Sequence, residues 1–509
     1  MTNPPTPEIS MCALPAQALH LSGATLIRAA YLTLVFCFAS AFPSHAQTFT
    51  TLASFNSTNG SAPGQVLIQG LDGDFYGTAE YGGANGGGTI FKITATGKLT
   101  TIYSFCSQLN CADGKFPLGS LLLANDGSLY GTTNQGGATG QGSVFKFARG
   151  ALTTLYSFCS QTNCSDGYFP DAGLLQAMNG NFYGTTNAGG TVGFGTIFEI
   201  TPSGKLTTRY NFCFELTCGQ FPQQPLIQGT NGNFYGMTPL GGPYGWGIVF
   251  GMSPKGGVIS LYNFVNASDG GNPRSGLVQA SNGDFYGTAF TGANGSCYGG
   301  CGTVFEITSA GQFSTLHTFC VQSNCADGAN PYAGLDLATD GNLYGTTVAG
   351  GANGVDCFGG CGSLFEITPT GQLTTLYSFC AQANCADGSS PYAGLLQATN
   401  GELYGTTYFG GTSNACAGGC GTVFSLSVGL RPFVQPVSTS GKVGAKVILL
   451  GNNLTRTRSV SFNGRSATFT VVSDTEITTT VPAGATSGTV QVVTSSGTLK
   501  SNVSFRVLP

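Results

Sequence analysis

The sequence has few charged residues, little histidine and almost no tryptophan. Lys, Arg, Asp and Glu make up 8% of the 509 residues, and the chain contains three histidines and one tryptophan, Trp246. Only His317 follows the predicted leader described below, so a Ser-His-Asp triad would need it, and a histidine-rich metal site is excluded. His317 stands where sister repeats carry tyrosine, which indicates a structural role.

Other recognisable chemistry is also missing. The sequence contains no phosphate-binding loop, no dinucleotide fingerprint and no basic, aromatic pattern typical of nucleic-acid binding. We therefore predict no catalytic residue, no cofactor and no nucleic-acid partner. Paired glycosidase carboxylates stay open, because acidic residues are available but nothing singles out two of them.

What the chain has in abundance is glycine, aromatic residues and an internal repeat. It contains 80 Gly, 36 Phe and 20 Tyr, and helix-length amphipathic patterns are hard to find, which predicts an all-β fold. The motif Asn/Asp-Gly-x-apolar-Tyr-Gly occurs seven times at a period near fifty residues. Its tyrosines are Tyr76, Tyr130, Tyr183, Tyr235, Tyr286, Tyr344 and Tyr404. Their identical placement favours packing between sheets over catalysis.

Each repeat divides into four predicted strands. In the later copies these are residues 393–398, Leu403–Tyr408, Gly362–Thr368 and Leu373–Phe379, with two-residue hairpin turns at the Asn-Gly and Asp-Gly pairs. Four strands in fifty-odd residues are typical of a β-propeller blade. We predict a seven-bladed propeller, with an open solenoid as the alternative.

The two ends of the array predict how it closes. The seventh copy has a third strand, Gly421–Ser427, but no fourth, and an orphan fourth-strand sequence, Thr50–Phe55, lies near the start. Supplying that strand to the last blade would remove exposed sheet edges. Length changes fall in the second-to-third-strand loops and in the loops that lead to the next blade. We expect binding on the face where both loop types emerge.

The first 46 residues resemble an export signal. Arg28 precedes the apolar run Ala29–Phe42, and Ser44–Ala46 forms a cleavage site before Gln47. The run is short for a membrane anchor, so we predict a secreted or cell-surface protein without a membrane span after cleavage. Residues 47–430 contain 9 basic and 19 acidic residues, against 8 and 2 in residues 431–509, and we place a domain boundary there.

Sixteen cysteines follow the leader and fall into eight local pairs. Loops without cysteine lack both partners, which predicts a disulfide within each loop in an oxidising compartment. Thiolate metal sites are the alternative. The predicted pairs are Cys106/Cys111, Cys159/Cys164, Cys213/Cys218, Cys297/Cys301, Cys320/Cys325, Cys357/Cys361, Cys380/Cys385 and Cys416/Cys420.

Five aspartates recur before a glycine after the cysteine-type loops. They are Asp113, Asp166, Asp269, Asp327 and Asp387. A ring of carboxylates could hold calcium, the one cofactor that the sequence leaves open. Asp-Gly is first a turn former, and no D-x-D-x-D-G loop is present, so we expect turns.

The repeats resemble the tandem GloVer repeat of exported bacterial "choice-of-anchor" proteins. The pattern appears in Pro391–Gly411 and Gly302–Thr308 and covers roughly Thr48–Ser427. Residues 431–509 resemble an IPT/TIG domain, an immunoglobulin-like sandwich, through Ser459–Gly464 and Val481–Gly484. The first resemblance implies no agreed activity, and the second implies a spacer or adhesion module.

These observations favour a secreted, non-enzymatic binding or adhesion protein. The face that carries its disulfide-cross-linked loops would bind an extracellular or cell-envelope ligand, either a polysaccharide or a protein. The competing hypotheses are a propeller hydrolase or lyase acting on polysaccharide, and a purely structural envelope protein.

Overall fold

The structure, a computed structural model, describes residues 47–215, 218–293, 295–297, 299–353 and 360–509. The predicted leader lies outside the described residues. Within them the chain is all-β, and the helical segments are short 3₁₀ turns. These turns are η1 (Leu109–Cys111), η2 (Thr162–Cys164), η3 (Ser323–Cys325), η4 (Ala383–Cys385) and η5 (Leu454–Arg456). None of these described turns has the length and apolar character that a membrane-crossing helix needs.

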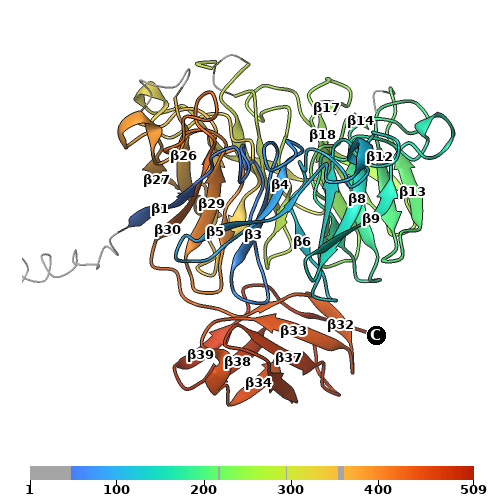
Figure 1. Cartoon of the computed structure of the whole chain (residues 1–509), viewed down its shortest axis with the longest axis vertical. Coiled ribbons are helices and arrows are strands. Elements are labelled where there is room, and N and C mark those ends of the chain that lie inside the picture. Colours follow the sequence, from blue (N-terminus) through green and yellow to red (C-terminus); the bar gives the residue numbers. More distant parts are fainter. Residues whose placement is uncertain (1–46, 216–217, 294, 298, 354–359) are drawn as a thin grey trace, which may run out of the picture. The chain divides into compact units, whose positions relative to one another are not determined.

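The described part of the repeat region forms seven four-stranded antiparallel sheets, which we number in chain order. Figure 1 shows them following one another through the repeats. Sheet 1 contains β2 (Ile68–Gln69), β3 (Phe75–Ala79), β4 (Thr89–Ile93) and β5 (Leu99–Ser104); sheet 2 contains β6 (Leu122–Leu123), β7 (Leu129–Thr133), β8 (Ser143–Ala148) and β9 (Ala151–Ser157); sheet 3 contains β10 (Leu175–Gln176), β11 (Phe182–Thr186), β12 (Thr196–Ile200) and β13 (Leu206–Asn211). Sheet 4 contains β15 (Ile227–Gln228), β16 (Phe234–Thr238), β18 (Ile248–Met252) and β19 (Val258–Asn263); sheet 5 contains β20 (Val278–Gln279), β21 (Phe285–Ala289), β22 (Thr303–Ile307) and β23 (Phe313–Thr318); sheet 6 contains β24 (Asp336–Leu337), β25 (Leu343–Thr347), β26 (Ser363–Ile367) and β27 (Leu373–Ser378). A small pair, β14 (Gly219–Gln220) and β17 (Leu240–Gly241), lies in the loops of sheet 4.

Sheet 7 combines the two ends of the repeat region. It contains β28 (Leu396–Gln397), β29 (Leu403–Thr407), β30 (Thr422–Ser427) and, as its fourth strand, β1 (Thr48–Ser54). β1 runs antiparallel to β30, from Thr48 opposite Ser427 to Ser54 opposite Thr422 (Figure 1). The strand expected at Thr50–Phe55 thus lies beside the strand expected at Gly421–Ser427.

Apolar clusters join each sheet to the next. One such cluster contains Phe75 and Phe91 of sheet 1 together with Tyr404 and Val423 of sheet 7. Equivalent clusters join sheets 1 and 2, 2 and 3, 3 and 4, 4 and 5, 5 and 6, and 6 and 7. Burying one sheet face against the next removes apolar surface from water, which is the main force holding such layers together.

The repeated Tyr-Gly pair is explained by this packing. Tyr130, Tyr183 and Tyr235 stack at 4.2–4.3 Å, between ring centroids, on the phenylalanine that begins the second strand of the following sheet. A Cβ atom built on Gly77 would lie 2.5 Å from the Phe91 ring of the neighbouring strand, so no larger residue fits. The tyrosines and glycines therefore have the packing role that the repeat predicted.

Two local predictions were wrong. The first strand was expected over residues 393–398, but β28 spans only Leu396–Gln397. The turns were expected to have two residues, but the amide of Ala398 donates to the carbonyl of Glu402, which encloses a three-residue loop. Gly401 alone takes a positive φ there, +93°, as in a type I turn followed by a bulge.

The remaining strands build the C-terminal sandwich. One sheet contains β31 (Gln435–Pro436), β33 (Lys446–Leu450), β37 (Glu476–Thr480) and β36 (Phe469–Val471), and the other contains β35 (Arg465–Ala467), β34 (Ser459–Phe462), β38 (Val490–Thr494) and β39 (Gly497–Lys500). A parallel pair, β32 (Ser440–Lys442) and β40 (Arg506–Leu508), lies beside them. Leu449, Phe462, Ile477 and Val492 belong to one buried core between the sheets, as expected for an immunoglobulin-like fold.

Candidate functional site

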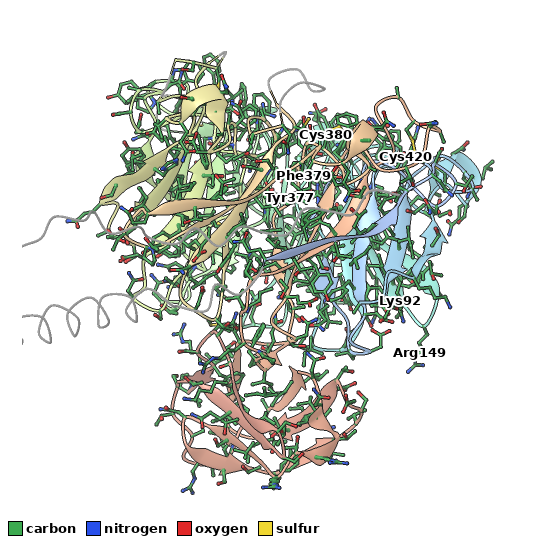
Figure 2. All side chains as sticks on the ribbon, turned by 90° about the vertical axis from the view of Figure 1, so that its left-hand side faces the viewer. Lys92, Arg149, Tyr377, Phe379, Cys380 and Cys420 are labelled. Atoms are coloured by element: carbon green, nitrogen blue, oxygen red, sulfur yellow. A yellow bond between two sulfur atoms is a disulfide. The ribbon has the colours of Figure 1, made fainter. Side chains whose placement is uncertain are left out.

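Two types of loop emerge at the same end of every repeat sheet: the loop between the second and third strands, and the loop that leads from the fourth strand to the next repeat. In an antiparallel sheet the second and fourth strands run in the same direction, so their following loops share one end. We call this end the loop face. Bridges such as Ser389 to Phe409 join the two loop types. Figure 2 shows Cys380 and Cys420 toward the loop face, and Lys92 and Arg149 at the opposite end, where the tight turns lie.

The loop face carries most of the exposed large apolar side chains of the described residues. Thirteen such side chains are exposed, and ten belong to the two loop types. Phe214 is 79% exposed and Leu109 is 86% exposed. The ten are Tyr81, Leu109, Val192, Phe214, Leu240, Tyr244, Trp246, Val265, Val321 and Phe409. Exposed apolar groups gathered on one face are typical of an interaction surface.

Disulfides cross-link these loops at seven places in the described part of the chain. Each bond joins two cysteines four or five residues apart in one loop, in the pairing that the spacing predicted. They are Cys106–Cys111, Cys159–Cys164, Cys213–Cys218, Cys297–Cys301, Cys320–Cys325, Cys380–Cys385 and Cys416–Cys420. For the eighth predicted pair, Cys361 is described, whereas Cys357 lies outside the described residues.

One group of cysteines also has the spacing of a metal site. The sulfurs of Cys297, Cys301, Cys320 and Cys325 all lie within 4.8 Å of one another. Zinc would require four thiolates, whereas a disulfide leaves none. In other repeats a cysteine pair of either loop type occurs without a second pair beside it, as at Cys106–Cys111. Each loop can therefore form with its own pair of cysteines alone. This independence favours two neighbouring disulfides.

The five recurrent aspartates are engaged inside the repeats. Asp113, Asp166, Asp269, Asp327 and Asp387 are all buried. The Asp387 carboxylate accepts hydrogen bonds from the Tyr377 hydroxyl at 2.8 Å and from the backbone amides of Ala381 and Gln382 at 3.0 and 3.2 Å. These bonds shape the loop, in keeping with the turn role, and leave the carboxylate few free acceptor positions. Calcium binding stays untested.

His317 takes the tyrosine's place in sheet 5. Its Nε2 lies 3.2 Å from the Asp327 carboxylate, and its ring contacts Phe319 edge-on. Burial works to raise the pKa of Asp327, but the hydrogen bonds from His317 and from backbone amides outweigh it and hold this pKa below its usual range. The geometry agrees with the structural role predicted for His317.

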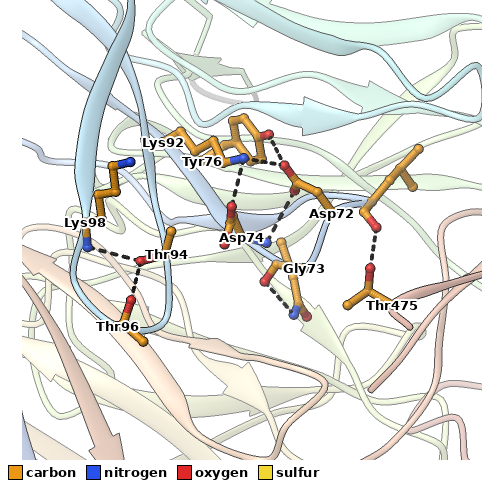
Figure 3. A network of polar contacts seen from close by, with 11 residues as sticks. Asp72, Gly73, Asp74, Tyr76, Lys92, Thr94, Thr96, Lys98 and Thr475 are labelled. Carbon is orange, nitrogen blue, oxygen red and sulfur yellow. Dashed lines mark hydrogen bonds and ion pairs between the residues drawn. The ribbon is translucent and has the colours of Figure 1, made fainter. Parts of the chain in front are cut away.

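At the opposite end of sheet 1, a charged network fastens a turn. Lys92 Nζ lies 2.6 Å from Asp72 and 2.8 Å from Asp74, and the Tyr76 hydroxyl donates to Asp72 at 2.7 Å (Figure 3). Burial opposes ionisation of Asp72, yet its bonds to Lys92 and Tyr76 lower its pKa. The carboxylates remain partly exposed, so the network contributes little to stability.

Two of the hollows among the described repeats involve residues that vary between the copies. The larger, about 1130 Å³, lies between loops of sheets 6 and 7, and Val348, Tyr392, Phe409 and Asn414 are among its lining residues. The second, about 490 Å³, is lined by residues from all seven sheets, and we call it the central cavity. Sequence reasoning missed the central cavity. The signal was available, because the residue after the repeated proline is of six different types in the seven copies, and it lines the cavity in each.

The sequence comparisons match family models to the repeats and to the C-terminal residues. The Gloeobacter/Verrucomicrobia repeat matches residues 38–242 and again residues 221–467. The chain belongs to this repeat family. An IPT/TIG domain matches residues 432–507, where the structure has its sandwich. No curated protein matches the sequence.

Solved structures resemble this chain at low identity. A fungal alcohol oxidase of the AA5 family, in complex with copper, is 13% identical, with a TM-score of 0.51, covering 91% of this chain and 100% of the oxidase. A periplasmic gluconolactonase of Pseudomonas aeruginosa is 14% identical, with a TM-score of 0.42 and coverage of 70% and 99%. A luciferin-regenerating enzyme is 11% identical, with a TM-score of 0.38 and coverage of 76% and 98%.

The oxidase's copper does not carry over to the residues present here. Copper(II) sites prefer nitrogen and oxygen ligands, with imidazole the usual nitrogen donor. His317 is the one histidine of the described residues, and it is bound to Asp327 within the loop structure of sheet 5. The described residues therefore do not fit that copper ion.

Proposed function

We propose that the seven repeat sheets close into a seven-bladed β-propeller, with residues 431–509 as a separate immunoglobulin-like module. The pairing of β1 with β30 supports this architecture, as does the apolar cluster between sheets 7 and 1. A cavity lined by all seven sheets also fits a ring. A Cβ on Gly421 of sheet 7 would meet the Pro63 ring at 2.6 Å, the same close approach that Gly88 makes to Pro117 of the next repeat.

On this scaffold we propose a secreted, non-enzymatic binding or adhesion protein. The observation that carries it is the loop face, where ten of the exposed large apolar side chains lie, four of them (Leu109, Phe214, Val321 and Phe409) in loops that contain a disulfide. Disulfides suit an oxidising, extracellular setting. The ligand would be an extracellular or cell-envelope polysaccharide or protein, and the leader would be cleaved after Ala46 on export.

The test is a binding screen of the oxidised protein against arrayed glycans and envelope extracts, with product analysis of every positive. Binding without product supports the proposal. Phe409→Ala and Trp246→Ala, on the loop face, should weaken that binding, whereas Ile259→Ala, exposed on β19, should not. Unchanged binding in both loop variants would place the site elsewhere.

A polysaccharide hydrolase or lyase is the second candidate. The observation that favours it is a pair of carboxyls in the central cavity, Asp171 and Asp336. Burial raises the pKa of each to about 6, the direction needed for a general acid. Release of saccharide products would support this candidate, and a screen with neither binding nor product would favour a purely structural envelope protein.

A further inference from the structure

The central cavity is lined where the repeats differ most. The residue after each repeated proline is, in chain order, Gly64, Leu118, Asp171, Gln223, Arg274, Tyr332 and Tyr392. All seven line the cavity. The prolines themselves are constant, and each packs on a glycine of the preceding sheet, as Pro391 does on Gly362. The packing around the cavity is therefore the same in every repeat, whereas most of the repeats contribute a different residue to the lining.

A second set of unlike residues stands beside the first. The residue two positions after the repeated Tyr-Gly-Thr or Tyr-Gly-Met segment is Glu80, Asn134, Asn187, Pro239, Phe290, Val348 or Tyr408. Several contact the first set. Asn187 donates to the Asp171 carboxylate at 2.8 Å, and the Tyr408 ring lies 5.1 Å from that of Tyr392. Members of the second set thus hold residues that line the cavity in place.

In sheets 5 to 7, the lining residues Tyr332 and Tyr392 belong to an aromatic arc. The rings of Phe290, Tyr332, Tyr392 and Tyr408 follow one another with centroid distances of 5.8, 4.9 and 5.1 Å. The Arg274 guanidinium lies over Phe290 and Tyr332, 5.4 and 5.6 Å from the ring centroids. Its Nε donates to Asn272 at 2.6 Å, which fixes the plane of the group.

Sheets 2 to 4 supply a polar arc. Asn134 and Asn187 both donate amide hydrogens to Asp171, one to each carboxylate oxygen. Gln223 and Gln224 continue the lining in the following repeat. A carboxylate oxygen with one donor can accept another, and a primary amide both donates and accepts. This arc is suited to a ligand edge that bears several hydroxyl groups.

We propose that the central cavity binds the ring of a neutral sugar. A pyranose has an apolar C–H face that can lie on Tyr332 or Tyr392, and an edge of hydroxyls that can bond to Asp171, Arg274 and the glutamines. Two carboxyl side chains, Asp171 and Asp336, and one guanidinium, Arg274, line the cavity, so the charge balance disfavours a uronate. The central cavity and the loop face are separate proposed sites that share only the class of ligand. Absence of binding at one site therefore leaves the proposal for the other intact.

The experiment is saturation-transfer NMR on the oxidised full chain with methyl glycosides of glucose, galactose, mannose and xylose, followed by titration of any that bind. Methyl glucuronoside and methyl glucosaminide serve as charged comparisons. We expect a neutral glycoside to bind. Tyr392→Ala and Asp171→Asn should each weaken it about tenfold or more.

Matched controls separate the cavity from the loops. Tyr244→Ala removes an exposed loop-face tyrosine outside the cavity, and Asp284→Asn changes a turn aspartate; neither should alter binding. Leu118→Trp would fill the cavity without removing a polar group, so it should abolish binding while the far-UV spectrum and the unfolding transition stay native. The inference is overturned if no neutral glycoside binds, if a charged comparison binds more tightly, or if Leu118→Trp leaves binding intact.

Discussion

The second strands of the repeat sheets are alike in all seven copies, whereas the first loop residue after each of these strands varies from copy to copy. All seven second strands keep the Tyr-Gly pair, because the tyrosine packs on the next sheet and the glycine lies against a phenylalanine ring. One residue beyond these strands, the seven copies carry Glu, Asn, Asn, Pro, Phe, Val and Tyr. Similarity among repeats marks positions fixed by packing, and difference marks surfaces free to meet a ligand. Each prediction below tests that division.

The largest effect should come from the residue that ends the closing strand. Phe55 is fully buried between sheets 7 and 1, with its ring 5.0 Å from that of Phe91. Phe55→Ala should lower the free energy of unfolding by about 3–5 kcal/mol, since it leaves a cavity. Denaturant unfolding measures it. The loop-face control Phe214→Ala should change stability by less than about 0.5 kcal/mol. Equal losses in both variants would contradict the division.

Next in size is the glycine of the repeated motif. Gly77→Ala and Gly345→Ala each place a Cβ 2.5 Å from a phenylalanine ring atom. Overpacking of this kind should cost about 1–3 kcal/mol, and the two costs should be alike because the environments are. Thermal unfolding of both variants checks this. A loss at one glycine and none at the other would mean that the copies are not equivalent.

A single loop disulfide should matter about as much or less. Replacing Cys106 and Cys111 by serine opens a loop closed over five residues, which should cost at most about 2 kcal/mol. The doubly substituted protein should keep its far-UV spectrum and lose protection from proteolysis only within that loop. Global unfolding would show that the staples hold the fold rather than the loop.

The smallest effect is a pH dependence from the central cavity. Burial raises the pKa of Asp171 from 3.8 to about 6, so the folded state holds its proton more tightly than the unfolded state does. The free energy of unfolding should therefore fall as pH rises from about 4 to about 6. Asp171→Asn should reduce this fall, and Asp171→Asn with Asp336→Asn should reduce it further. An unchanged slope in the double variant would contradict the assignment.

The sequence predicted the parts of the fold that repeat packing dictates. The period and the strand sequences predicted the bounds of the second, third and fourth strands to within about one residue. Thr50–Phe55 was matched to its partner strand because its sequence resembles the fourth strands of other repeats and the seventh repeat has no fourth strand of its own. The first strands were overestimated, since their apolar residues line the central cavity and continue beyond the hydrogen-bonded pair. The turn type was missed because Asn-Gly suits two-residue and three-residue loops alike.

The candidate sites were harder to predict. The loop face followed from connection lengths and cysteine pairs, which are local features. The central cavity depends on residues from seven repeats that meet only in space, and each of them, taken alone, is an ordinary loop residue. A comparison of the copies position by position would have exposed it, because Arg274 and Asp171 occupy the same position in different repeats.

Hydrogen exchange of the β1 amides tests the central claim, that the beginning of the chain completes the last sheet, most directly. Ring closure predicts that Thr48–Ser54 exchange as slowly as the fourth strand of an interior sheet, Leu206–Asn211, and that Phe55→Ala speeds exchange in β1 and β30 together. Rapid exchange of Thr48–Ser54 beside a protected β30 would contradict the account.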